Sequence, residues 1–376
     1  MAPAPNRLVL EGVPRVGFYR GGPGCPEDIP FPSVMRVLME YLDEGDLGCH
    51  SILGLKPGCK INCSYSFFIG VSGVASSLSW KSGWDGDAAE VMPMTDDPAA
   101  PFDRAFQAAG YEYQVTGADK CREDEASCRR RIIESIQADR PVVAFGPIGP
   151  PEAAILTGYD EGGDVLIGWS FFQNTAAFNA GVEFEPSGQF RKRNSFDYPA
   201  GFSFIVVGQK KEKPPLPDTY RRALEWMLDV ARTRITRGGR HNGLAAYATW
   251  ADHLLGDEDF PEDEATLRQR HDVHNGAVGM LAEARWYGSQ FLIQASNPDV
   301  LHYSMTEDLL HAAACYAAEH DLMWQLWDLA GGNGNPDAYR YFADPAVRRH
   351  MVPIIQQARE KDAQATEHIT RALARR

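Results

Sequence analysis

Histidine is almost absent from the first 240 residues of this 376-residue chain. His50 is the only one there, and the other nine follow residue 240. A reaction that needs histidine as a general base therefore has a single candidate in that part of the chain. The chain also lacks a Walker phosphate loop, a dinucleotide-binding fingerprint and a Gly-x-Ser-x-Gly nucleophile motif. We therefore predict no nucleotide cofactor, and no other cofactor.

Positive charge and long apolar runs are also scarce. Lysine and arginine number 37 against 51 acidic residues, for a net charge of −14, which argues against a nucleic-acid-binding surface. No apolar run reaches the ~18 residues that a membrane-spanning helix needs. The N-terminus lacks the pattern of a signal peptide, and seven cysteines, an odd number, indicate reduced thiols. We expect a cytoplasmic protein that binds neither nucleic acid nor membrane.

The sharpest change in composition lies at residues 209–217, which read QKKEKPPLP. This charged and proline-rich segment cannot continue a strand or a helix. It predicts a linker between a mixed first domain, residues 1–208, and a helical second domain, residues 218–376. The predicted fold class is therefore α+β.

The first domain is predicted to begin with helices. Ser33–Leu42 carries apolar residues at helical spacing, and Ser33 is placed to cap it. The other helices predicted there are Ser66–Trp80, Phe102–Ala109 and Glu123–Gln137. The Gly70–Gly73 segment would allow close backbone approach.

Short buried strands follow, in the stretch Arg140–Gln173. They are predicted at Pro141–Phe145, Ala153–Thr157 and Asp164–Trp169. The last is entered through Glu161-Gly162-Gly163, a turn that uses the positive φ angles of glycine. Phe178–Phe184 and Phe202–Val207 are expected to extend the same antiparallel sheet.

The second domain reads as an all-α bundle. Its main predicted helices are Tyr220–Arg237, Gly243–Leu255, Glu264–Ser296, Thr306–Gly331 and Pro345–Arg375. The long third helix is expected to break near Gly276 or Gly279. Extended apolar helix faces of this kind favour a homodimer.

Glu152 is the first candidate for a functional residue. It follows Gly149-Pro150-Pro151 and precedes an apolar strand, so its carboxylate either faces a cleft or lies at an exposed strand entry. In a cleft it could orient an amine or guanidinium, or act as a base. The aromatics Trp80, Trp84, Trp169, Phe171 and Phe172 are predicted to gather around that cleft. Trp169, Trp80 and Tyr159 are the predicted ligand-binding residues.

The cysteines offer two further hypotheses. Cys25, in CPEDIPFPS, is the thiol nearest to the first predicted helix, and is either a buried apolar residue or a nucleophile. Cys49, His50, Cys59 and Cys63 are residue types that bind zinc, but adjacent ligands and irregular spacing fit a zinc site poorly. We predict no metal.

Polar residues in the helical domain are read mainly as solvated surface. His271 and His274 share one helix face, and Asp308 and His311 share another. Arg285, together with Glu283, lies in the more apolar stretch LAEARWYGSQFL. These two are expected to pair within the core or to face the domain junction.

Three segments, Pro14–Leu42, Phe67–Trp84 and Arg140–Gln173, resemble papain-like cysteine peptidases of the bacteriocin-processing type. They also resemble the related family of the butirosin-biosynthesis acyltransferase, in which a helical domain follows a papain-like one. The resemblance implies a papain-like fold and transfer of an acyl group from a carrier-protein thioester to an amine. Where that family has its catalytic histidine, this chain has Glu152. The equivalent of its cysteine falls near Pro30, eleven residues before Tyr41.

The expected function follows from the lack of the family's histidine and cysteine at these two positions. We expect a papain-like protein that binds a small amine- or amide-containing molecule near Glu152 without Cys–His catalysis. One alternative is an acyltransferase or amidohydrolase that uses Cys25 as a displaced nucleophile. The other is a protein-interaction module that docks a partner through the helical bundle.

Overall fold

A computed structural model of the protein describes residues 5–19, 25–44, 47, 63–86, 91–197, 201–236, 238–332 and 335–375. The chain forms two compact units. The sheet unit consists of Met1–Leu47 and Phe106–Pro214, and the helical unit of Gly48–Ala105 and Pro215–Arg376. The prediction that residues 1–208 form one domain is therefore wrong, because the two compact units interleave along the chain. Helix α3 (Ala100–Ala109) spans one of the divisions.

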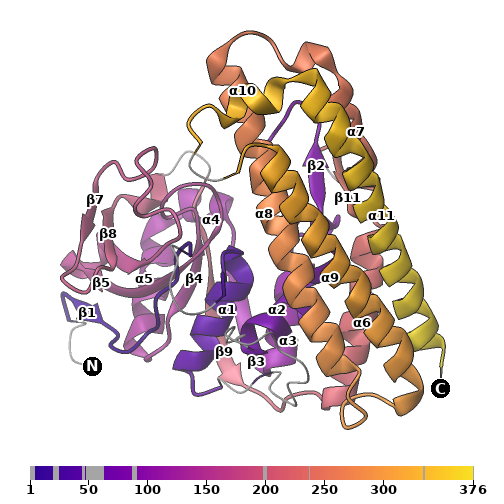
Figure 1. Ribbon diagram of the computed structural model, residues 1–376. Helices are drawn as coiled ribbons and strands as arrows, with labels where there is room; N and C mark the ends of the chain where they lie inside the picture. The colour runs from indigo at the N-terminus through magenta and orange to yellow at the C-terminus, as the bar shows by residue number, and fades with distance from the viewer. Residues whose placement is uncertain are drawn as a thin grey trace. The chain divides into compact units, whose positions relative to one another are not determined.

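The sheet unit is built on an antiparallel sheet. Its strands are β1 (Leu8–Val9), β3 (Tyr111–Thr116), β4 (Val142–Phe145), β5 (Ala153–Asp160), β6 (Val165–Trp169), β7 (Val182–Phe184), β8 (Phe190–Arg193) and β9 (Ser203–Lys210). They follow the order β3-β9-β4-β5-β6-β8-β7, and β1 pairs with β5 (Figure 1). The predicted strands β4, β5, β6 and β9 are confirmed, and only the last three residues of Phe178–Phe184 form a strand.

The centre of the sheet is buried on both faces. Every residue of β4 and β6 is buried, and α1 (Pro30–Tyr41) packs on β5. Helix α5 (Glu125–Gln137) contacts β4, β5 and β9, and the short α4 (Ala118–Glu123) precedes it. Apolar β-branched runs form these strands because both of their faces meet other side chains. The predicted turn is confirmed, with positive φ at Gly162 and Gly163.

Two helix starts differ from the sequence analysis. Helix α1 begins after Ile29, which makes no side-chain cap, so Ser33 lies inside the first turn rather than at the cap. Proline at the first helical position fixes φ and needs no amide partner, which removes the need for a capping side chain. The helix expected at Glu123–Gln137 is divided at Asp124, whose side chain accepts a hydrogen bond from the Ser127 amide and caps α5.

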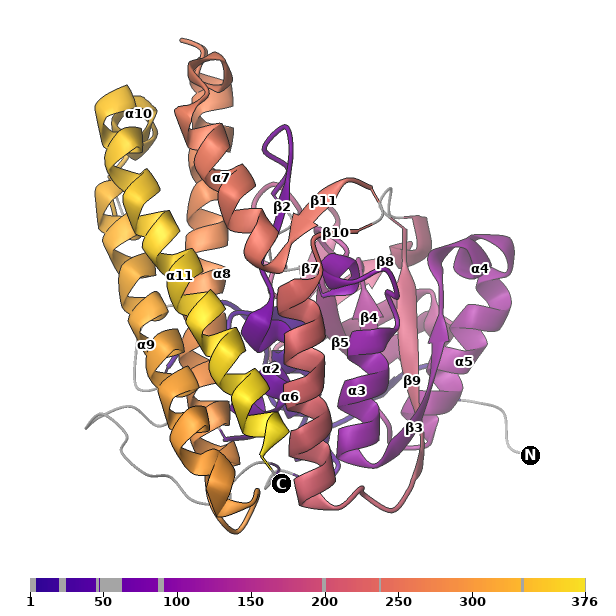
Figure 2. The ribbon, with the colours of Figure 1, turned by 90° about the vertical axis from the view of Figure 1, so that its right-hand side faces the viewer.

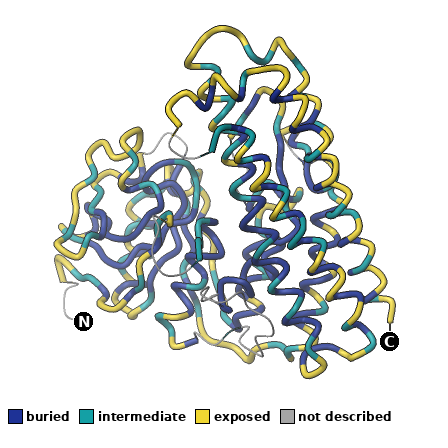
Figure 3. Tube along the Cα trace, in the orientation of Figure 1, coloured by how far each residue is buried: buried dark blue, intermediate teal, exposed yellow. Residues whose placement is uncertain are grey.

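The helical unit is dominated by long helices. The helices wholly within it are α2 (Cys63–Val71), α6 (Leu216–Arg232), α7 (Ala246–Leu255), α8 (Glu264–Ala295), α9 (Thr306–Leu329), α10 (Ala338–Ala343) and α11 (Pro345–Ala374). A small sheet of β2 (Ser79–Lys81), β11 (Arg240–Asn242) and β10 (Ile235–Thr236) accompanies them. Helix α9 packs along both α8 and α11 (Figures 1 and 2). Buried and exposed positions alternate along these helices (Figure 3).

Helix α8 is continuous, contrary to the break expected near Gly276 or Gly279. Each glycine destabilises the helix by about 1 kcal/mol relative to alanine. The packing of α8 along α9 offsets this cost.

The helix predicted at Ser66–Trp80 ends at Val71, and β2 begins at Ser79. Gly73 has a φ of 88°, which stops the helix. All nine residues of α2 are buried. A Cβ atom on Gly70 would lie 2.3 Å from the Phe291 ring, so the predicted close approach is confirmed.

Candidate ligand site at one edge of the sheet

Glu152 and Trp169 lie at the same edge of the large sheet. In the antiparallel register, Phe145 at the end of β4 pairs with Ala153 at the start of β5, and Trp169 at the end of β6 pairs with Ile155. Glu152 directly precedes Ala153. The β5–β6 hairpin thus places two residues that are 17 positions apart in the sequence at the same end of the strands.

The loop that carries Glu152 is compact. It runs from Gly146, with a φ of 73°, through Gly149, with a φ of 81°. A Cβ atom on Gly149 would lie 2.8 Å from the Cβ atom of Phe172, so glycine is needed for packing as well as for backbone conformation. The backbone amide of Glu152 donates to the Pro150 carbonyl at 2.6 Å, and Glu152 is half-buried. The carboxylate therefore stands at a strand entry that is partly shielded from water.

Trp169 is buried, with 7% of its surface exposed, yet its indole Nε1 makes no hydrogen bond within the described residues. A buried donor without a partner costs on the order of 1–3 kcal/mol. The Arg15 guanidinium lies 5.5 Å from the ring centroid, a cation–π distance. Trp169 thus carries a buried hydrogen-bond donor that the described residues leave unsatisfied, which sequence reasoning could not foresee.

Aromatic rings surround this edge. Phe18 lies with its ring centroid 5.2 Å from both Phe171 and Phe172, in edge-to-face contact. Phe172 makes a further edge contact with Phe178 at 5.8 Å. These contacts join Phe18 to an apolar cluster of rings in the segment that follows β6.

Tyr159 does not belong to this edge. It lies six residues from Ala153, roughly 20 Å further along β5. Its hydroxyl accepts from Gln137 Nε2 at 3.1 Å and donates to the Pro5 carbonyl at 3.2 Å. Since Tyr159 is fully buried and both bonds are internal, its role in the structure is to fix α5 and the N-terminal segment.

Trp80 lies in β2 of the helical unit, as part of an aromatic core. It stacks on Trp250 with centroids 5.4 Å apart, and its Nε1 donates to His253 Nδ1 at 3.1 Å. Trp84 packs edge-on against it at 5.4 Å. The aromatic cluster expected around one cleft is therefore divided between units, with only Trp169, Phe171 and Phe172 belonging to the sheet unit. The sequence alone gave no sign that β2 joins the helices.

Cys25 is disulfide-bonded, which corrects the expectation that all the thiols are reduced. A disulfide sulfur is not a thiolate, so Cys25 could act as a nucleophile only after reduction. The free cysteines among the described residues are Cys63, Cys121, Cys128 and Cys315. Cys63 is buried at the first residue of α2, whereas Cys49, His50 and Cys59 lie outside the described residues. Of the four candidate zinc ligands, only Cys63 therefore lies in the described part of the chain.

The helical unit contains a buried ionic network. Of its members, the sequence pattern indicated only Arg285. Arg285, on α8, is completely buried. Its Nε donates to Glu319 of α9 at 2.9 Å, and its Nη2 to Asp362 of α11 at 2.8 Å. The Tyr247 hydroxyl lies within hydrogen-bond distance of both carboxylates and can donate its one proton to either of them. Arg285 thus pairs within the core, as expected, while Glu283 instead accepts from the Tyr65 hydroxyl.

The charge in this network is unbalanced, because one guanidinium faces two carboxylates. Burial raises the pKa of Glu319 to about 8, although the Arg285 charge opposes that rise. A proton on Glu319 would leave one positive and one negative charge in the core. With Arg285, Glu319 and Asp362 all shielded from solvent, the network ties α8, α9 and α11 together rather than meeting a ligand.

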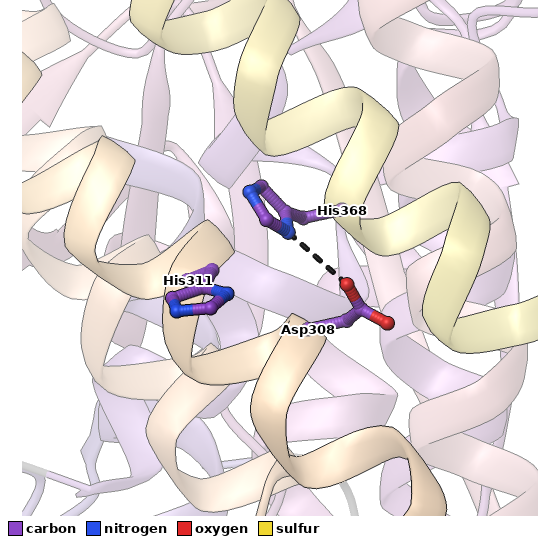
Figure 4. Close-up of side chains that lie close together, drawn as sticks. All are labelled: Asp308, His311 and His368. Atoms are coloured by element: carbon purple, nitrogen blue, oxygen red, sulfur yellow. Dashed lines mark hydrogen bonds and ion pairs between the residues drawn. The ribbon is translucent and has the colours of Figure 1, made fainter.

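A second polar cluster consists of Asp308, His311 and His368, whose ligand atoms lie within 4.8 Å of one another (Figure 4). Sequence reasoning paired the first two and missed His368, which is remote in the chain. His368 Nδ1 lies 3.2 Å from Asp308 Oδ1, as does Arg371 Nε, and Arg375 Nη2 lies 2.6 Å from Oδ2.

The arginines around Asp308 determine whether this cluster can bind a metal ion. Burial alone would raise the pKa of Asp308, but hydrogen bonds from His368 and Arg371 and the charge of Arg375 hold it below its usual range. A divalent cation there would meet two guanidinium groups that already neutralise its only carboxylate. The residues present do not fit a metal site.

No protein-family model matches this chain, and no curated protein is significantly similar to it in sequence. Among the described residues, no helix combines the length and apolar character needed to cross a membrane. The function must therefore be argued from the site itself.

Proposed function

We propose that this protein binds a small amine- or amide-containing molecule at the sheet edge of Glu152 and Trp169, on a papain-like scaffold that no longer performs thiol catalysis. The scaffold assignment rests on the resemblance of three sequence segments. The ligand class rests on the two side chains at the edge.

The observation that carries the proposal is the lack of a thiol–imidazole pair in the sheet unit. The sequence of this unit contains no histidine. Of its three cysteines, Cys25 is disulfide-bonded, while Cys121 and Cys128 are buried. Burial raises the pKa of the Cys121 thiol well above its usual range, which disfavours the thiolate. The residues of this unit therefore supply no thiolate–imidazole pair.

The start of α1 supports the same conclusion. A papain-like nucleophile would sit at the N-terminus of a buried helix, where the helix dipole favours a thiolate. Helix α1 begins with Pro30, Phe31 and Pro32, all of them buried and without a nucleophilic atom in the side chain. The start of α1 thus offers no nucleophilic side chain at its first three residues.

The ligand chemistry follows from complementary groups. A carboxylate such as Glu152 favours a protonated amine or an amide N–H, and a half-buried position strengthens that interaction. The unused Trp169 N–H favours a carbonyl oxygen. The Phe18, Phe171 and Phe172 rings suit an apolar or aromatic body. Phenethylamine, a protonated amine on a short chain that ends in a phenyl ring, is the simplest probe of the carboxylate and the rings.

Calorimetric titration with phenethylamine tests the proposal. We expect Glu152→Gln to weaken binding by roughly tenfold or more, because a charge-assisted hydrogen bond contributes about 1.5–3 kcal/mol. Glu134→Gln, an exposed substitution on α5, is the matched control and should bind like wild type. Equal losses in both variants, or no binding to the wild type, would refute the proposed site.

A further inference from the structure

A solvent-open cavity of about 450 Å³ lies within the helical unit. Its lining residues come from the end of α6 and the segment after it, from β11, from the start of α7 and the residues before it, and from the middle of α11. Its volume falls within the roughly 300–1,000 Å³ typical of small-molecule sites. The cavity is separate from the sheet-edge site, since all of its lining residues belong to the helical unit.

Every charged or titratable side chain that lines this cavity is basic. Arg232, Arg234 and Arg359 contribute guanidinium groups, and His241 contributes an imidazole. The remaining lining is small or apolar, and includes Leu244 and Ala248. Three arginines around one cavity are notable in a chain whose net charge is −14.

These three arginines form no ion pair with a carboxylate anywhere in the described part of the chain. Arg232 donates to the Thr370 hydroxyl at 2.6 Å, and Arg359 Nε donates to the Leu244 carbonyl at 3.2 Å. Both acceptors are neutral, so they orient the guanidinium groups without cancelling their charge. Asp229 and Glu360, which neighbour them in sequence, make no ion pair with them among the described residues. The positive charge remains available to a ligand.

We propose that this cavity binds a small organic phosphate monoester. Guanidinium groups match the geometry of phosphate oxygens and can hold them with paired hydrogen bonds. A phosphate monoester carries up to two negative charges, which suits several arginines better than one carboxylate does. The first residues of α7 also line the cavity, so the positive end of the helix dipole adds to the attraction.

The apolar part of the lining selects for an organic ester over the free ion. Leu244, Ala245 and Ala248 offer a surface on which a short hydrocarbon or ring can rest. Inorganic phosphate would use the arginines alone. The ester is therefore expected to bind more tightly than either inorganic phosphate or the corresponding alcohol.

The test is calorimetric titration of the full chain with phenyl phosphate, in phosphate-free buffer at constant ionic strength. Arg234→Gln and Arg359→Gln should each weaken binding at least about tenfold, the effect of losing one charge-assisted hydrogen bond. Arg349→Gln is the control. Arg349 is exposed on the same helix as Arg359, ten residues and about 15 Å away, and should leave binding unchanged.

Comparison ligands distinguish the possible sources of affinity. Phenol should not bind measurably, and benzoate and inorganic phosphate should bind more weakly than phenyl phosphate. Benzoate or inorganic phosphate binding as tightly as the ester would overturn the proposal of an organic phosphate. So would an equal loss of affinity in Arg349→Gln, or no binding of phenyl phosphate to the wild type. Circular dichroism of each variant verifies that loss of binding is not loss of folding.

Discussion

Replacing Arg285 with methionine is expected to lower the free energy of unfolding by about 3–5 kcal/mol. Arg285 is the only cation in contact with the buried carboxylates of Glu319 and Asp362 among the described residues. Without it, these carboxylates stay in the core with no countercharge, or must take up protons. Urea denaturation followed by the helical circular dichroism signal measures the change.

Two further variants separate charge from packing. Arg349→Met, on the exposed face of α11, should change stability by no more than about 0.5 kcal/mol. Adding Glu319→Leu and Asp362→Leu to Arg285→Met should recover a large part of the loss, because the buried charges are then removed together. If Arg285→Met is no more destabilising than Arg349→Met, the network does not hold the three helices together.

His274 is expected to make the protein acid-sensitive. It is completely buried on α8, its Nδ1 accepts from the Trp250 indole at 3.2 Å, and its Nε2 has no partner within the described residues. Burial, and to a smaller extent the charge of His271, lower its pKa to about 3. In the unfolded chain its pKa is about 6.5. Below that value the unfolded state binds a proton that the folded state does not.

The sign of the pH dependence follows from this difference. The contribution of His274 to stability is fully present above about pH 6.5 and is lost as pH falls toward 3, at roughly 1.4 kcal/mol per unit. Denaturation midpoints between about pH 6 and pH 4 measure the slope. In His274→Phe the slope should become shallower, whereas in His350→Gln, an exposed control, it should not change. An unchanged slope in His274→Phe would show that His274 is protonated while folded.

Local patterns predicted most of the secondary structure. Strands β4 and β6 are β-branched or apolar runs bounded by glycine and proline, and the long helices α8, α9 and α11 carry helical periodicity over many turns. Local patterns did not predict which segments pack against one another. The stretch from α2 to β2 was read as part of the first domain, but α2 contacts α6 and α8, and β2 pairs with β11. Sequence periodicity shows which face is apolar and not which other segment covers it.

For the candidate sites, too, the sequence indicated local geometry but not the contacts between distant segments. A hairpin has a fixed register, so the turn at Glu161–Gly163 was enough to bring Glu152 and Trp169 to one edge. Tyr159, on the same strand, was misplaced because it lies at the opposite end. The residues that pair with Arg285, and the arginines of the basic cavity, come from helices far apart in the chain. Only tertiary packing brings those groups together, so no local signal could reveal them.

The central claim is that the sheet unit binds its ligand without thiol chemistry. Native iodoacetamide labelling, followed by mass spectrometry and then by phenethylamine titration, tests it most directly. Buried Cys121 and Cys128 and disulfide-bonded Cys25 should label uniformly slowly, and the labelled protein should bind phenethylamine like the untreated protein. A single fast-labelling cysteine in this unit, whose alkylation abolishes phenethylamine binding, would contradict the claim and support a catalytic thiol.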